Sequence, residues 1–256
     1  MEKFEFIKKQ IKLAKNHGLY GFGIIYYWFS GKKIYNKPIN IFLNKEINFP
    51  FFLIWKNNKY EFKYKNTKEN IIIENKYNCK TAFMLIIDIK KYLISKKYIK
   101  IKKKPVLAIY EPFIINNLKE FLFYLRKYAK NLGIKEIFIY GTLNENADLN
   151  YSKLFDYYFE FPPKNINLNK LIKNNYFFYY IGLIYKGNIN YTNTKIDRGI
   201  MIEWDNTPEK ENSTIFNDYS PEKLYIITKI IINSSELFFN KNNNFLFINF
   251  FMLNFY

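Results

Sequence analysis

One alternation constrains the fold of this chain most: short, unbroken apolar runs alternate with longer amphipathic segments. The apolar runs indicate buried strands, because they lack the polar residue at every second position that marks a half-exposed strand. They occupy residues 21–27, 50–55, 105–110, 136–140, 156–161, 200–202 and 245–251. Strands of this kind are typical of a parallel sheet covered by helices, so we predict an α/β fold.

Amphipathic helices are predicted between the strands, where apolar residues recur every three or four positions. They cover residues 4–16, 78–95, 117–132 and 221–235, with a shorter helical stretch at 38–45. Gly18 and Gly133 are expected to end two of these helices. We expect a polar surface loop at 59–77.

The number of predicted strands favours a (β/α)8 barrel of the TIM type over a doubly wound sheet. No glycine-rich phosphate loop follows the first strand, which also weighs against a Rossmann fold. We therefore predict a single barrel domain over residues 1–256, with an insertion at 164–198 before the next strand. In such a barrel the carboxyl ends of the strands share one mouth, where active sites lie.

The predicted strand ends carry aromatic rings, amides and carboxylates. An indole offers a flat apolar face to a sugar ring, and carboxylates and amides hydrogen-bond its hydroxyls. For the stretch 204–208 the alternative is an Asx-type turn with a packed tryptophan, and both interpretations stay open. The predicted carbohydrate-binding residues are Tyr27, Trp28, Trp55, Asn57, Tyr110, Trp204, Asp205 and Asn206, with Glu111 and Thr142 at the same mouth.

The formal net charge of +18 invites a nucleic-acid or anionic-membrane interpretation. However, Arg126 and Arg198 are the only arginines, and the abundant residues are Lys, Asn, Ile, Phe and Tyr. These are the residues whose codons are richest in A and T, so a genomic base bias explains the profile. Phosphate and base recognition favours arginine, and we therefore rank a basic nucleic-acid-binding protein as the weakest alternative.

Cys79 is the single cysteine, which excludes an intramolecular disulfide and fits a reducing compartment. With one His and one Cys, a His/Cys zinc site is not expected, and we predict neither a metal nor a cofactor. No apolar window is long enough for a transmembrane segment, and the N-terminus lacks the apolar core of a signal peptide. We expect a cytoplasmic protein, or one peripheral to the inner membrane.

Six segments of the chain resemble the WbsX-type glycosyltransferases, whose domain is related to family-99 glycoside hydrolases. They are YGFGIIYYWFSGK (20–32), FPFFLIWKNN (49–58), KPVLAIYEP (104–112), FDYYFEFPP (155–163), WDNTP (204–208) and LFINF (246–250). The resemblance implies a (β/α) barrel that acts on glycosidic linkages. It also implies a role in bacterial surface-polysaccharide assembly, namely lipopolysaccharide O-antigen or capsule.

The chain departs from the family pattern at several places. Asn58 stands where the family has Glu, and Glu111 stands where Arg is common. By the resemblance, a first strand would precede the opening helix, and a final Asn-Glu-Trp segment with the catalytic glutamates would follow 245–251. We therefore expect a chain truncated at both ends, with a second chain completing the barrel. The alternative is a catalytically impaired, sugar-binding remnant.

Glycosidic chemistry needs a proton donor and a second carboxylate at the anomeric centre. The weak catalytic candidates left in this chain are Glu160, Glu203 and Asp205. Asp205 matches the WDNTP motif and is expected to bind hydroxyl groups. Glu203 lies two residues earlier and shares its side of the strand, while Glu160 is equally well explained as a structural hydrogen-bond acceptor.

Overall fold

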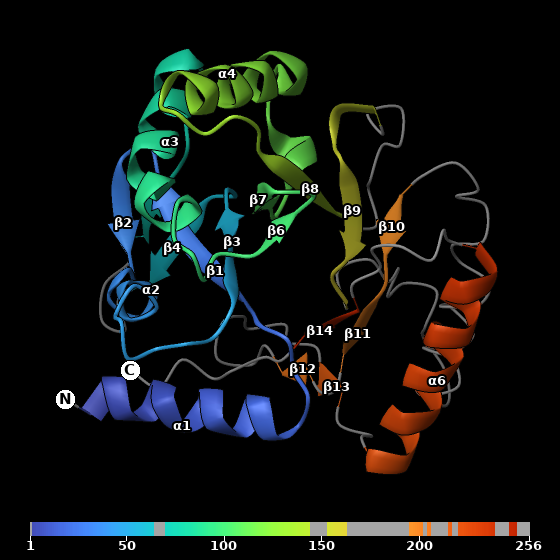
Figure 1. Ribbon diagram of the computed structural model, residues 1–256. Helices are drawn as coiled ribbons and strands as arrows, with labels where there is room; N and C mark the ends of the chain where they lie inside the picture. Colours follow the sequence, from blue (N-terminus) through green and yellow to red (C-terminus); the bar gives the residue numbers. More distant parts are fainter. Residues whose placement is uncertain are drawn as a thin grey trace. The chain divides into compact units, whose positions relative to one another are not determined.

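The computed structural model describes residues 2–63, 70–143, 153–162, 195–201, 204–205, 215–216, 220–238 and 246–249. The chain forms two compact units, the first made of residues 1–141 with 153–156 and the second of residues 142–152 with 157–256. Each unit has strands and helices of its own (Figure 1). The single domain expected over 1–256 stays a prediction.

Parallel strands form the centre of the first unit, in the order β8-β7-β3-β1. They are β1 (Phe22–Phe29), β3 (Phe51–Lys56), β7 (Lys104–Ile109) and β8 (Phe138–Leu143). Every residue of β3 except Lys56 is buried, as is all of β8, which is why these strands read as continuous apolar runs. The strands predicted from these runs are confirmed.

Antiparallel strands extend this centre. β2 (Lys32–Ile34) returns along β1 through Ser30 and Gly31, whose positive φ angles of 48° and 100° suit a tight two-residue hairpin turn. β6 (Lys100–Ile101) pairs with β7. β4 (Tyr60–Lys63) pairs with β5 (Asn70–Ile73), so the prediction of a plain loop at 59–77 is wrong for these residues. Each of these strands has only four residues, and the lysine-rich segment around them indicated a loop.

The helices of the first unit are α1 (Glu2–Asn16), α2 (Lys37–Ile41), α3 (Cys79–Leu93) and α4 (Leu118–Asn131). They confirm the predicted helices, and a 3₁₀ turn (Pro112–Ile114) leads into α4. The Asn78 side chain caps α3 by accepting from the Thr81 N–H at 2.9 Å. α3 and α4 pack against each other, each with a buried apolar face.

The second unit contains two parallel strand pairs. β9 (Tyr157–Glu160) pairs with β10 (Ile196–Asp197), and β11 (Gly199–Met201) pairs with β14 (Phe247–Asn249). β9, β11 and β14 lie in predicted strands, whereas β10 lies in the stretch predicted as an insertion. α6 (Pro221–Phe238) is the predicted helix.

One strand of the second unit corrects the prediction for the WDNTP motif. β12 (Trp204–Asp205) pairs antiparallel with β13 (Ile215–Phe216), beyond the end of the strand predicted at 200–202. Trp204 and Asp205, the first two residues of the motif, are therefore strand residues. Neither the composition nor the proline at 208 signalled this pairing.

Candidate functional site

The carboxyl ends of β1, β3 and β7 present different residues on the two faces of the sheet. Successive strand residues point to opposite faces, and residues in register on parallel strands share a face. Tyr26 is in register with Trp55, and Trp55 with Ile109. Tyr27 is in register with Lys56, one position further along each strand.

The face with Tyr26, Trp28 and Trp55 is covered by helices. The Tyr26 ring lies 6.2 Å from Tyr92 of α3, and Trp55 stacks at 5.7 Å on Phe121 of α4 (centroid distances). Figure 1 shows α3 and α4 side by side in this unit.

Both tryptophans of this face are fully enclosed, with 0% of their surface exposed. Trp28 Nε1 donates to Asp88 Oδ2 of α3 at 2.6 Å, and Trp55 Nε1 donates to the Trp28 carbonyl at 2.9 Å. Both rings therefore pack in the interior of the unit, where they leave no surface for the carbohydrate contact predicted for them.

The opposite face carries a row of three residues, Tyr27 of β1, Lys56 of β3 and Tyr110 directly after β7. The Tyr110 N–H donates to the Trp55 carbonyl at 3.0 Å, which continues the β3–β7 ladder by one step. Lys56 Nζ lies 5.2 Å from the ring centroid of Tyr27 and 5.5 Å from that of Tyr110. The ammonium group is therefore held between two rings by cation–π attraction.

Buried amides fix the strand ends that carry this row. Asn57, 0% exposed, donates from Nδ2 to the Glu111 carbonyl at 2.8 Å and accepts at Oδ1 from the Glu111 N–H at 2.7 Å. Asn75 Nδ2 donates to the carbonyl oxygens of Asn57 and Trp28 at 3.0 and 3.3 Å. Asn57 and Asn75 thus hold the ends of all three strands, a positioning role in place of the direct sugar contact predicted for Asn57.

A neutral tyrosine completes this arrangement. The Tyr77 hydroxyl donates to the Asn57 carbonyl at 2.6 Å. Burial is the main cause that raises the pKa of Tyr77 to about 12. The phenol is therefore a stable donor at neutral pH.

The two positions that depart from the family pattern contact each other. Asn58 Nδ2 donates to Glu111 Oε1 at 3.2 Å. Asn58 Oδ1 is buried and has no hydrogen-bond partner among the residues that the structure describes. A buried acceptor without a donor costs free energy, so this atom is an unsatisfied position directly after β3.

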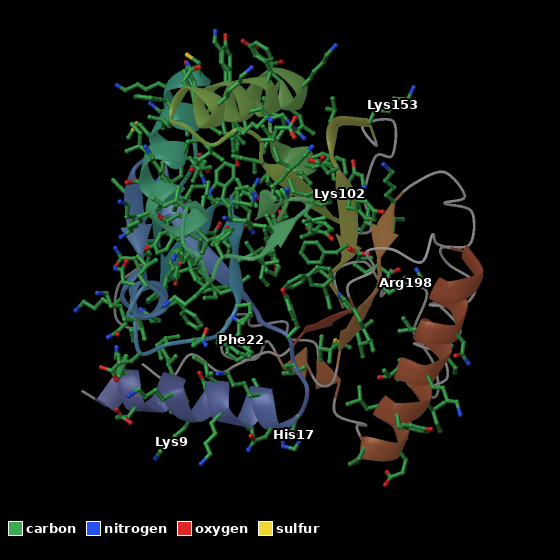
Figure 2. The ribbon with its side chains drawn as sticks, viewed as in Figure 1. Lys9, His17, Phe22, Lys102, Lys153 and Arg198 are labelled. Carbon is green, nitrogen blue, oxygen red and sulfur yellow. The ribbon has the colours of Figure 1, made fainter. Side chains whose placement is uncertain are left out.

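In the second unit, Glu160 is held by two neighbours and only 1% of its side chain is exposed. Arg198 Nη1 binds Glu160 Oε1 at 2.5 Å, and the Gly199 N–H donates to Glu160 Oε2 at 3.2 Å (Arg198 is labelled in Figure 2). A side chain at residue 199 would collide with the Glu160 carbonyl, so glycine is required there. This geometry fits the structural interpretation of Glu160.

The remaining predicted residues are distributed as follows. Thr142 is buried near the end of β8. Trp204 and Asp205 form β12, while Glu203 and Asn206 lie outside the described residues.

Sequence reasoning missed Lys56, Asn58 and Asn75 as members of the site. Lys56 could have been found from its in-register position beside Tyr27, whereas no sequence signal marks Asn75.

Among the described residues, no three His, Cys, Asp or Glu side chains gather closely enough to hold a metal ion. No helix in that part of the chain has the length and apolar character needed to cross a bilayer.

The sequence matches the family model described as "Glycosyltransferase WbsX" over residues 1–251. The chain belongs to the WbsX glycosyltransferase family. This confirms the resemblance seen in its motifs. The matched range also includes the strand pairs and α6 of the second unit.

Part of the chain is also similar to curated proteins of Xanthomonas. This WbsX-family chain is 25% identical over 158 residues to "Uncharacterized protein WxcX" of two Xanthomonas campestris pv. campestris strains, B100 and ATCC 33913. The match covers 61% of this chain and 23% of that relative, so the chain spans less than a quarter of its length.

Among solved structures, a "Glycoside hydrolase-like protein" superposes with a TM-score of 0.63 at 14% sequence identity. The superposition covers 99% of this chain and 76% of that one. At this identity the likeness speaks for the fold alone. The fold is mixed α/β with a mainly parallel sheet, which is compatible with a TIM-like barrel.

Proposed function

We propose that this WbsX-family chain acts on glycosidic linkages as a glycosyltransferase of bacterial surface-polysaccharide assembly, in a cytoplasmic setting. The family match over residues 1–251 carries the reaction class. We further propose that the (β/α) barrel closes around the sheet face opposite α3 and α4, and that carbohydrate binds there.

The row Tyr27–Lys56–Tyr110 supports this location. The part-exposed ring of Tyr27 offers an apolar face and a hydroxyl to a sugar, whereas Tyr110, only 6% exposed, offers little surface, and the ammonium group held between the two rings supplies hydrogen-bond donors. Asn57 and Asn75 keep these groups in register, because they fix the three strand ends.

The acids take different roles in this proposal. Glu160 fixes β9 to the start of β11 through Arg198 and Gly199, since both of its carboxylate oxygens are engaged. Asp205 binds sugar hydroxyls together with Trp204 and Asn206, as the WDNTP motif predicts. Glu203 remains the candidate for proton transfer.

A second candidate function is carbohydrate binding without turnover. The ion pair of Glu160 favours it, because this acid would lose Arg198 and Gly199 before it could transfer a proton. Completion of the barrel by a second chain belongs to the same proposal. Nucleic-acid binding is less favoured, since both arginines lie in internal ion pairs, Arg126 with Asp156 and Arg198 with Glu160.

The test incubates the purified chain with a panel of nucleotide sugars and oligosaccharide acceptors and detects transfer by mass spectrometry. Lys56→Met is expected to lower kcat/KM at least ~10-fold through lost donors to the sugar. Lys59→Met is the matched control, because the Lys59 side chain is 60% exposed and pairs only on the surface with Glu61.

Three outcomes separate the alternatives. Transfer that depends on Lys56 supports the proposal. Oligosaccharide binding without transfer, measured by saturation-transfer NMR, supports the binding protein. A chain that neither transfers nor binds any saccharide, but binds DNA with steep salt dependence, would overturn both.

A further inference from the structure

The outer surface of α3 and α4 exposes large apolar side chains that a water-facing helix surface does not need. Phe83, Ile87 and Ile94 are 38%, 48% and 59% exposed, and Phe123 of α4 is 59% exposed. Phe83 and Ile87 are four residues apart on α3, and Ile94 follows seven residues later, directly after the helix, so the three lie in one stripe. This stripe is distinct from the buried face of α3 that contains Leu85, Ile86 and Ile89.

Aromatic contacts join this stripe to α4 and make the surface continuous. The Phe83 ring packs edge-on against Tyr128 at 5.1 Å, and Tyr128 stacks on Tyr124 at 5.9 Å. Phe123 lies 5.6 Å from Tyr124. We call the surface formed by Phe83, Ile87, Ile94, Phe123, Tyr124 and Tyr128 the α3–α4 aromatic face.

Lysines lie within and beside the α3–α4 aromatic face. They are Lys80 and Lys90 of α3 and Lys119, Lys127 and Lys130 of α4, whereas Lys91 Nζ donates to Asn40 Oδ1 at 2.8 Å. Lys127 Nζ lies 5.9 Å from the Phe123 ring centroid, so its stem covers apolar surface while its charge stays in water.

The two helices contain only two acids. Asp88 is bound by Lys33 Nζ and Trp28 Nε1, which leaves Glu120 as the exposed carboxylate of these helices. An acidic protein partner and an anionic lipid surface would both suit this charge. The interspersed order of lysine and aromatic side chains favours lipid, because rings can sit at the headgroup boundary while ammonium groups reach the phosphates.

We propose that the α3–α4 aromatic face binds the surface of an anionic phospholipid bilayer. The helices lie flat on the headgroups, with Phe83, Ile87 and Phe123 entering the apolar boundary and the lysines on the phosphates. This inference does not depend on the proposed reaction.

The single cysteine provides the probe. Cys79 is exposed and lies one turn before Phe83 on α3, so a polarity-sensitive fluorophore attached there reports on this face. The labelled full chain is titrated with vesicles of phosphatidylcholine alone and with vesicles that also contain phosphatidylglycerol. We expect a blue shift with the anionic vesicles only, and its loss at high salt.

Two variants locate the surface. Phe83→Ser with Phe123→Ser is expected to weaken vesicle binding at least ~10-fold, because both rings leave the apolar boundary. Leu13→Ser on α1 is the matched control, since Leu13 is 62% exposed and lies on another surface. Circular dichroism confirms that each variant is folded.

Several results would overturn the proposal. One is vesicle binding that the double serine variant leaves unchanged, which would indicate non-specific attraction by lysines elsewhere. Another is the absence of any shift with anionic vesicles. A third is a dimer that the double variant dissociates, which would assign the face to a second copy of the chain.

Discussion

The side chain of Asn57 binds both backbone groups of Glu111, its Nδ2 donating to the carbonyl at 2.8 Å and its Oδ1 accepting from the N–H at 2.7 Å. The amide thereby takes the place of a peptide group beyond the last residues of β3 and β7. This pairing fixes the backbone on either side of Lys56 and Tyr110. The shape of the candidate site therefore depends on a buried side chain that would not itself touch the sugar.

Replacement of Asn57 by alanine leaves the Glu111 N–H and carbonyl without these partners. We expect the free energy of unfolding to fall by about 2 kcal/mol, because unpaired polar groups keep their desolvation cost. Urea denaturation measures the change. Asn116→Ala, at an exposed turn position, is the control and should leave stability unchanged. Equal effects of the two substitutions would contradict the role of Asn57.

Tyr98 bridges β3 and β7 at a second point. Its buried hydroxyl accepts from the Leu53 N–H at 3.0 Å and donates to the Val106 carbonyl at 2.7 Å. Tyr98→Phe is expected to destabilise the chain by about 1–3 kcal/mol, with both backbone groups left unpaired. Tyr225→Phe is the matched control, since Tyr225 is 65% exposed. A Tyr98→Phe protein as stable as the control would show that water replaces the hydroxyl.

The ion pairs of Glu160 and Glu136 differ in burial and should differ in energy. Glu160→Gln leaves the guanidinium of Arg198, 14% exposed, without its counter-charge, and we expect a loss of about 3 kcal/mol. Glu136→Gln breaks a surface pair with Lys104, where Glu136 is 57% exposed, and should change little. Thermal unfolding of the two variants gives the comparison. A surface effect as large as the buried one would refute this ranking.

Buried tyrosines predict how stability depends on alkaline pH. Burial raises the pKa of Tyr77 and of Tyr92 to about 12, and it raises those of Tyr26 and Tyr98 further. Because the pKa is raised in the folded state, the contribution to stability is complete below pH 10, the ordinary value. It is lost as pH rises from 10 towards 12 and beyond, since the unfolded chain releases protons first.

Ultraviolet absorbance of tyrosinate, followed together with circular dichroism, measures this behaviour. We expect part of the tyrosines to ionise only as the chain unfolds. Ionisation of all tyrosines near pH 10 in a chain that stays folded would show that these four hydroxyls are accessible.

The regular elements of the first unit could be predicted because their apolar periodicity is strong. The runs at 50–55 and 105–110 became β3 and β7, and Asn78 marks the start of α3 as a cap. The hairpin of β4 and β5 was missed, since few residues with weak alternation form it. The strand at Trp204–Asp205 could not be predicted from the motif at 204–208, because its pairing partner β13 begins ten residues further along the chain.

The site could be predicted only in part. The predicted site uses the ends of several strands, but Tyr27 and Trp28 are neighbours on one strand and cannot face the same side. The alternation of side chains along a strand would have grouped Tyr27, Lys56 and Tyr110 on one face of the sheet. It would have placed Trp28 and Trp55 on the other face, which the helices cover. Contacts across long sequence separations, such as Asn75 with Trp28 or Arg198 with Glu160, leave no periodic signal.

The two arginines are informative because the composition is otherwise biased towards lysine. In a chain whose basic residues are otherwise lysine, Arg126 and Arg198 each bind a carboxylate from a distant segment. The planar guanidinium suits such partly buried pairs better than an ammonium group. Their rarity was noted in the sequence but its structural meaning was not.

The central claim is that carbohydrate binds at the carboxyl ends of β1, β3 and β7, on the face opposite α3 and α4. A crystal structure of the chain soaked with an oligosaccharide that it binds tests this most directly. We predict density for a sugar ring in contact with Tyr27, Lys56 and Tyr110, and none against Trp28 or Trp55. A sugar bound elsewhere, with this row unoccupied, would contradict the account.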